Sequence, residues 1–153
     1  PATLAQSLAV FRRLVEVLGS SQAVLTQSKN AQVAIRRLAE LELLAGNTEE
    51  ADSIYQLLTQ YFPQHQQYIH GRAKTATALE DYAVALPLWR KLAANVTAGT
   101  DLWYESKYQM IACLLPSDPQ AAGQVYRQTI RLSPEVPPEW RLPFRELAAK
   151  LDQ

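Results

Sequence analysis

The chain has 153 residues, 48% of them hydrophobic, which is enough apolar material for one sizeable core and therefore for one domain, residues 1–153. Its 15 basic and 15 acidic side chains balance, so the electrostatic attraction that brings proteins to nucleic acid or to anionic membranes is not expected. No apolar run approaches the roughly 20 residues of a membrane span, so membrane insertion is not expected either. The only cysteine, Cys113, lies in the apolar stretch "MIACLL", which predicts a buried thiol and leaves the cellular compartment open.

Helical spacing of apolar residues runs through almost the whole sequence, and alternating β-branched runs are absent, which predicts an all-α fold. The first predicted helix covers residues 3–18. The stretch that follows, "GSSQAVLTQSK", is expected to form either a loop or an extended start of the next helix.

A helical hairpin is predicted over residues 31–65. The apolar residues of its first helix follow three- and four-residue steps and form one stripe, made up of Ala31, Ala34, Ile35, Leu38, Leu41 and Ala45. Gly46 can end this helix because glycine accepts a left-handed conformation. The second helix then runs to about Tyr61 and stops at Pro63.

The same pattern recurs downstream. Ala85 lies 85 − 51 = 34 residues after Ala51, and Ala122 lies 122 − 85 = 37 residues after Ala85. Phe11 lies 55 − 11 = 44 residues before Tyr55, so residues 3–18 align with a second helix. The recurrence predicts repeats at 31–65, 66–99 and 101–134, followed by a capping helix at 137–152.

These units resemble the tetratricopeptide repeat family, whose helical hairpins are about 34 residues long. In the first unit, Leu38 and Ala39 stand where the family has Leu-Gly, Ala51 stands at its small helix-crossing site and Tyr55 at its aromatic site. The resemblance covers roughly residues 31 to 150, while Arg72 and Glu80 depart from the pattern. It implies a right-handed α-solenoid of about three hairpins with flanking N-terminal and C-terminal capping helices. A ladder of core aromatic residues is expected at Phe11, Tyr55, Trp89 and Tyr126.

Residues 3–18 align with a second helix, yet no first helix precedes them in the sequence. One apolar flank of this segment is therefore expected to be exposed. We also expect the natural protein to carry further helical repeats upstream of Pro1.

Catalytic and metal-binding patterns are weak. His65 and His70 lie five residues apart, which places them about 140° apart around a helix and not on one face. Glu40 and Glu42 occupy positions typical of solvated helix charges, and the glycines form no phosphate-binding loop. No catalytic residue, metal or cofactor is predicted, and the protein is not expected to be an enzyme.

A stacked helical array presents an extended concave face, which favours a scaffold that binds peptide segments of other proteins. Two alternatives remain. The array can join copies of itself into a homo-oligomer through its open ends, or it can be an accessory part of a larger protein or enzyme.

The family resemblance implies that the first helix of each hairpin lines the concave face. The positions carried across are Val33, Arg36, Arg37, Glu40, His70, Lys74, Thr77, Trp103 and Lys107. This set is more basic than the chain average, so an acidic or carboxylate-ended peptide is the expected ligand, with Trp103 as an anchor. Family members that clamp a terminal carboxylate use asparagines where Glu40 and Gly71 stand. The alternative interpretation is that these are solvated charges that happen to align.

Overall fold

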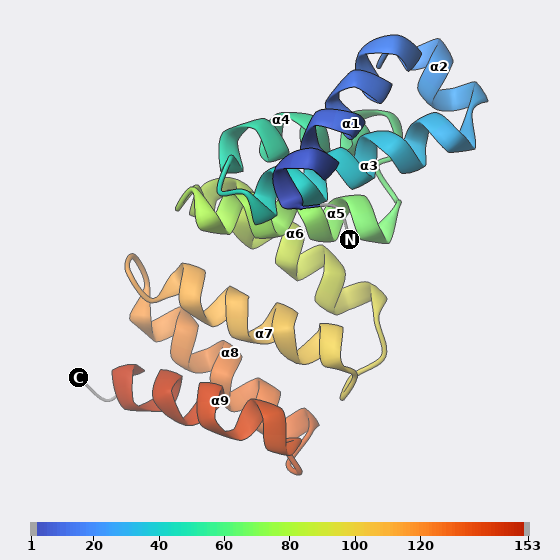
Figure 1. Ribbon diagram of the computed structural model, residues 1–153. Helices are drawn as coiled ribbons and strands as arrows, with labels where there is room; N and C mark the ends of the chain where they lie inside the picture. The colour runs from blue at the N-terminus through green and yellow to red at the C-terminus, as the bar shows by residue number, and fades with distance from the viewer. Residues whose placement is uncertain (1–2, 152–153) are drawn as a thin grey trace. The chain divides into compact units, whose positions relative to one another are not determined.

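Helices make up every regular element between residues 3 and 151, the part of the chain that the computed structural model describes (Figure 1). The chain divides into two compact units, Pro1–Leu79 and Glu80–Gln153, which we call the N-terminal unit and the C-terminal unit. The boundary falls inside the predicted repeat at 66–99. The two helices of that repeat therefore belong to different units, and each unit is described by itself.

From residue 3 onward, the N-terminal unit contains five helices. They are α1 (Leu4–Leu18), α2 (Gln22–Gln27), α3 (Lys29–Leu44), α4 (Thr48–Tyr61) and α5 (Gln66–Ala78). Helix α3 packs against α1, α4 and α5, and α4 packs against α5 (Figure 1). The predicted hairpin at 31–65 corresponds to α3 and α4.

The segment between α1 and α3 follows neither of the two predicted alternatives. It forms the separate short helix α2, whose N-terminus is capped by the hydroxyl of Ser21. Ser28 ends α2 and caps α3, because its extended backbone breaks the helix while its hydroxyl accepts a hydrogen bond from the amide of Ala31 at 3.2 Å. Leu25 of α2 is fully buried against Ile35 and Leu58, so this segment is part of the core.

The predicted apolar stripe of α3 is confirmed over most of its length. Its members from Ala31 to Leu41 are at most 7% exposed, whereas Ala45 lies exposed at the helix end beside Gly46, which has the predicted positive φ of 85°. Ala51, at the predicted helix crossing, is fully buried. The close approach of α3, α4 and α5 therefore rests on small side chains between larger ones.

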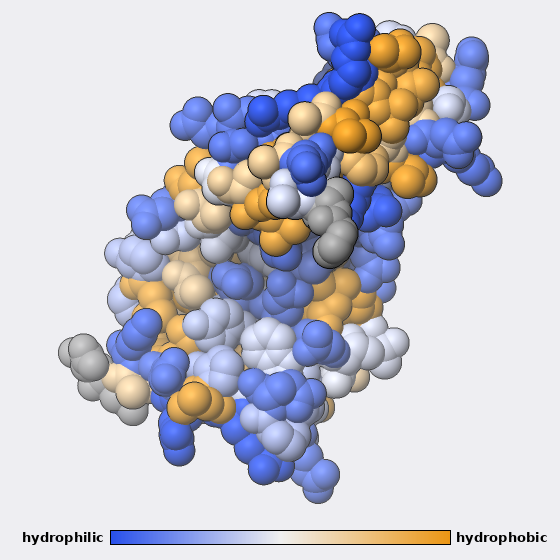
Figure 2. Space-filling view, viewed as in Figure 1, coloured by the Kyte–Doolittle hydropathy of each residue, from blue (hydrophilic) through white to orange (hydrophobic). Residues whose placement is uncertain are grey.

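Helix α1 buries one face and exposes another. Leu8 is 8% exposed and packs with Leu38 and Leu41 of α3, while Val10 is 63% and Val17 is 70% exposed. Figure 2 shows hydrophobic surface where α1 and α2 lie. The expected exposed apolar flank is confirmed. Leu14 is 39% exposed and lies on the same outer face as Val10 and Val17.

Up to residue 151, the C-terminal unit contains four helices. They are α6 (Tyr82–Asn95), α7 (Asp101–Leu114), α8 (Pro119–Leu132) and α9 (Pro138–Leu151). Helix α7 packs against α6, α8 and α9, and α8 also packs against α9. The core of this unit contains Trp103, Tyr104, Ile111, Leu114, Ala122, Phe144 and Leu147.

The predicted aromatic ladder is buried at two of its four positions. Tyr55 is 4% exposed and Trp89 is fully buried, whereas Phe11 and Tyr126 are only half-buried. Cys113 is 2% exposed, which confirms the buried thiol. Glu80, which replaces the glycine usual in the family's turn, has a φ of 58°, a left-handed conformation that costs a non-glycine residue free energy.

Candidate functional site

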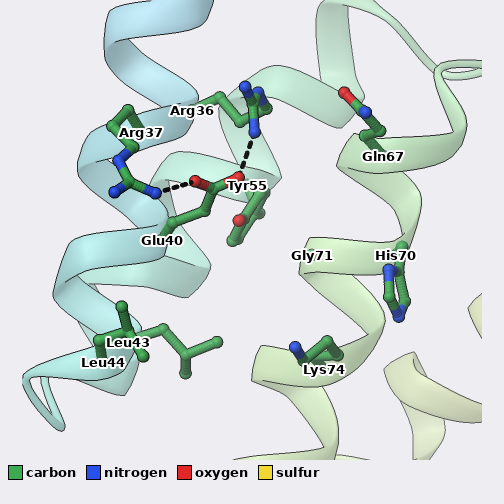
Figure 3. Close-up of a pocket in the computed structure, with 10 residues that line it drawn as sticks. All are labelled: Arg36, Arg37, Glu40, Leu43, Leu44, Tyr55, Gln67, His70, Gly71 and Lys74. Carbon is green, nitrogen blue, oxygen red and sulfur yellow. Dashed lines mark hydrogen bonds and ion pairs between the residues drawn. The ribbon is translucent and has the colours of Figure 1, made fainter.

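A cavity of about 440 Å³ opens between α3 and α5 of the N-terminal unit, with α4 beneath it (Figure 3). We call it the groove. Its lining residues are Arg36, Arg37, Glu40, Leu43, Leu44, Tyr55, Gln67, His70, Gly71 and Lys74. Two helices separated in sequence by the whole of α4 thus contribute its two walls.

The α3 wall follows from helical spacing. Residues one and two turns beyond Arg36 share its side of the helix, opposite the buried stripe that contains Ile35 and Leu38. Arg36 donates a hydrogen bond to one oxygen of the Glu40 carboxylate, and Arg37 Nη1 lies 3.0 Å from the other. One carboxylate is therefore shared by two guanidinium groups. At its far end this wall becomes apolar with Leu43 and Leu44.

The floor depends on a close contact between α4 and α5. A Cβ atom added at Gly71 would lie 2.1 Å from Cε1 of Tyr55, so the aromatic ring lies against the bare backbone of α5. Burial, reinforced by the negative charge of Glu40, raises the pKa of Tyr55 to about 12, while Arg36 acts in the opposite direction. The phenol is therefore neutral at physiological pH, and the floor carries no charge of its own.

The α5 wall presents Gln67, His70 and Lys74 along one side of the helix (Figure 3). Among the arginine, lysine and carboxylate side chains of the lining, the three cations Arg36, Arg37 and Lys74 outnumber the one carboxylate of Glu40, a net charge of 3 − 1 = +2. Cations that face each other across a concave surface attract anionic groups more strongly than scattered surface charges do. The groove can therefore hold an acidic ligand.

The structure brings together five of the nine residues predicted for the concave face. They are Arg36, Arg37, Glu40, His70 and Lys74. Val33 is 55% exposed but does not line the cavity. Thr77 lies beyond it on α5, where its hydroxyl donates to the carbonyl of Ala73 at 2.8 Å.

Trp103 and Lys107 lie in the C-terminal unit, and the prediction that they are accessible is wrong. Trp103 is 3% exposed and packs edge-on against Tyr104, with ring centres 5.1 Å apart. The Lys107 ammonium lies 5.5 Å from the centre of the Trp103 ring, and burial lowers the pKa of Lys107. The physical reason is that α7 is surrounded by three helices, so that the face carrying these residues is enclosed.

The predicted set of site residues lacked the other half of the lining, which is Leu43, Leu44, Tyr55, Gln67 and Gly71. Leu43 and Leu44 could have been found by extending the Arg36 side of α3 by two turns. A glycine inside a helix often marks the close approach of another group, so Gly71 also carried a signal. Tyr55 was correctly placed in the core, but its edge also forms the groove floor.

Glu42 corrects the expectation of a solvated carboxylate. It is 3% exposed, and it accepts two hydrogen bonds of 2.7 Å from the Arg12 guanidinium of α1 and one of 2.7 Å from the Asn47 side chain. The hydrogen bonds from Arg12 lower the pKa of Glu42, against the effect of burial. The Arg12–Glu42 ion pair links α1 to α3 outside the groove.

Residues 3–151 contain neither a cluster of metal-ligand side chains nor a membrane-spanning helix. No group of three or more His, Cys, Asp or Glu side chains is placed to hold a metal ion in that part of the chain. None of the helices described there combines the length and the apolar character needed to cross a bilayer.

Comparison with known proteins gives one informative likeness. No protein family model matches the chain, and no curated protein matches it. Among solved structures, the chain is similar to one described as "MamA RS-1 ArsTM double mutant", with a TM-score of 0.61 over 98% of this chain and 95% of that one. The fold is a helical repeat. At 13% sequence identity the likeness concerns the fold alone.

Proposed function

We propose that the N-terminal unit binds an extended, acidic segment of another protein in the groove between α3 and α5. The observation that carries this proposal is the placement of three cations from two separate helices around one open cavity. An extended peptide suits such a cavity because its backbone can follow the groove while successive side chains meet different parts of the wall.

The groove also offers apolar contact. Leu44 is 69% exposed, and Leu43 lies beside it at the end of the α3 wall (Figure 3). Exposed leucine next to arginine and lysine suits a ligand that combines an apolar side chain with acidic neighbours. A segment in which leucine and glutamate alternate is therefore a better match than a uniformly acidic one.

The likeness in fold agrees with this role, since helical-repeat arrays present extended surfaces to protein partners. We propose a scaffold or adaptor without catalytic activity. The groove contains no pairing of a nucleophile with a base among its lining residues, and its acidic side chain is engaged by arginines.

A second candidate function is self-assembly, favoured by the exposed apolar flank of α1. Val10, Leu14 and Val17 follow steps of four and three residues and form a stripe on one side of the helix. Light scattering over a range of protein concentrations tests this candidate. A mass that rises with concentration and falls back in a Val10→Ser/Val17→Ser variant supports it, and a constant monomer mass removes it.

The test of peptide binding uses end-blocked fluorescent peptides in which a leucine is flanked by glutamates, glutamines or lysines. We expect fluorescence anisotropy to show binding of the glutamate peptide alone, weakening with added salt. Lys74→Glu and Arg36→Glu should each abolish it. Lys29→Glu is the matched control, because it makes the same charge change on an exposed residue of α3 that does not line the groove. Equal effects of Lys29→Glu and Lys74→Glu, or no binding by any peptide, would remove the proposal.

A further inference from the structure

Glu40 places a carboxylate in the lining of a groove that otherwise carries positive charge. Its carboxylate extends from α3 into the groove beside Tyr55, and both of its oxygens are engaged by arginines of the same helix (Figure 3). An anionic side chain thus occupies the two guanidinium groups that would otherwise be the groove's best receptors for an anion.

The ion pairs that hold Glu40 are accessible to solvent. The side chains of Arg36, Glu40 and Arg37 are 28%, 31% and 50% exposed. Pairs exposed to water are weak and can exchange partners, since solvent screens the attraction and the side chains regain rotamer freedom on separation. Another carboxylate in the groove can therefore take the place of Glu40.

We infer that Glu40 is a built-in competitor that occupies the place of the ligand's carboxylate in the free protein. This inference rests on the proposed function. When an acidic segment binds, one of its carboxylates pairs with Arg36 and Arg37, and Glu40 turns to solvent. Lys74 remains available on the opposite wall for a second acidic group.

Glu40 changes which ligands the groove prefers, in addition to lowering the positive charge of the groove. A ligand with one isolated carboxylate exchanges one ion pair for another and gains little. A ligand that also reaches Lys74 and the leucines of α3 gains contacts that Glu40 cannot make. Glu40 therefore selects for extended acidic segments and against single carboxylates.

The test compares Glu40→Gln with wild type in binding the glutamate-flanked leucine peptide. Glutamine keeps the shape of the side chain but releases the arginines. We expect the dissociation constant to fall about two- to fivefold, the range that corresponds to loss of a competing exposed ion pair. Affinity for free acetate, which carries one carboxylate and no leucine, should rise by at least as large a factor.

Glu16→Gln is the matched control. Glu16 forms an ion pair with Arg13 at 2.6 Å on α1, outside the groove, so its removal makes the same change in net charge. It should leave peptide affinity unchanged. Added salt should reduce the gain in Glu40→Gln, because the exposed ion pairs that Glu40 forms with Arg36 and Arg37 are themselves screened. Glu40→Ala should show the same gain, and denaturation midpoints verify that each variant is folded.

The results expected for these variants distinguish the role of the groove as binding site from the role of Glu40 as competitor. If Glu40→Gln leaves the affinity unchanged or weakens it while Lys74→Glu abolishes binding, the groove is the binding site but Glu40 is not a competitor. If Glu16→Gln gives the same gain as Glu40→Gln, overall charge explains the effect and the inference is overturned. If neither Lys74→Glu nor Glu40→Gln has an effect, the proposed function and the inference both fail.

Discussion

Helices α3 and α7 are each the first helix of a predicted hairpin, yet their polar residues have opposite surroundings. Arg36, Arg37 and Glu40 of α3 line an open groove, whereas Trp103 and Lys107 of α7 are enclosed in the core of the C-terminal unit. The same position in a repeat becomes a binding surface or a core site according to the helices that surround it.

The largest expected effect tests the enclosed side of this comparison. Trp103→Ala removes a large side chain that is 3% exposed and should lower the free energy of unfolding by about 3 to 5 kcal/mol. Arg36→Ala, on a side chain exposed to the groove, should cost less than about 1 kcal/mol. Chemical denaturation measures both. Equal losses in the free energy of unfolding would contradict the contrast between an exposed Arg36 on α3 and a buried Trp103 on α7.

A somewhat smaller effect is expected from the floor of the groove. Gly71→Ala places a Cβ atom within the ring of Tyr55 and should destabilise the N-terminal unit by about 2 to 3 kcal/mol through overpacking. Gly123→Ala in α8 is the control, because its Cβ atom would meet only the flexible end of Arg127, at 3.2 Å. That variant should be neutral or gain up to about 1 kcal/mol of helix propensity. Tolerance of both alanines would contradict the close contact between α4 and α5.

Glu42 and Glu40 provide a comparison between a buried and an accessible carboxylate on the same helix. Glu42→Gln should cost about 1 to 2 kcal/mol, because the buried Glu42 carboxylate accepts charge-assisted hydrogen bonds from the half-exposed Arg12, while Glu40→Gln should cost little. The folded-state pKa of Glu42 lies below its ordinary value, so the pair stabilises fully above the unfolded-state pKa and loses this contribution as pH falls through the folded-state value.

The pH dependence can be measured as the denaturation midpoint from neutral to acid pH. Wild-type protein should lose more stability on acidification than Glu42→Gln. Hydrogen exchange should show the loss first in α1, which this ion pair fastens to α3. Parallel acid profiles for the two proteins would count against the ion pair as a stabilising contact.

The smallest expected effect concerns the turn before α6. Glu80 has a φ of 58°, so Glu80→Gly relieves left-handed strain but adds freedom to the unfolded chain. We expect a net gain of about 0.5 to 1 kcal/mol in thermal or chemical denaturation. A loss of similar size would indicate that the Glu80 side chain makes a stabilising contact that outweighs the strain.

Much of the fold could be predicted from sequence because helical spacing and repeat period are local properties. They placed the hairpin at 31–65, while the charged side of α3 that lines the groove was implied by the family resemblance. The short helix α2 was missed because its formation depends on Ser21 and Ser28 caps and on burial of Leu25 against distant residues.

The rest of the site depends on contacts that spacing does not encode. Glu42 is buried through Arg12, which lies 30 residues away in sequence, and Tyr55 forms the groove floor because Gly71 of another helix leaves room for its ring. The burial of Trp103 depends on the packing of α6, α8 and α9 around α7. Family resemblance alone could not distinguish an open helix face from an enclosed one.

The most direct test of the central claim is a two-dimensional NMR titration of the wild-type protein with the glutamate-flanked leucine peptide. We predict shifts in the amide signals of α3 and α5 around Arg36, Glu40, Gly71 and Lys74. The indole signal of Trp103 should stay unchanged, because its side chain lies in the core of the other unit. Shifts centred on α7 with α3 and α5 unaffected, or no shifts at saturating peptide, would contradict the account.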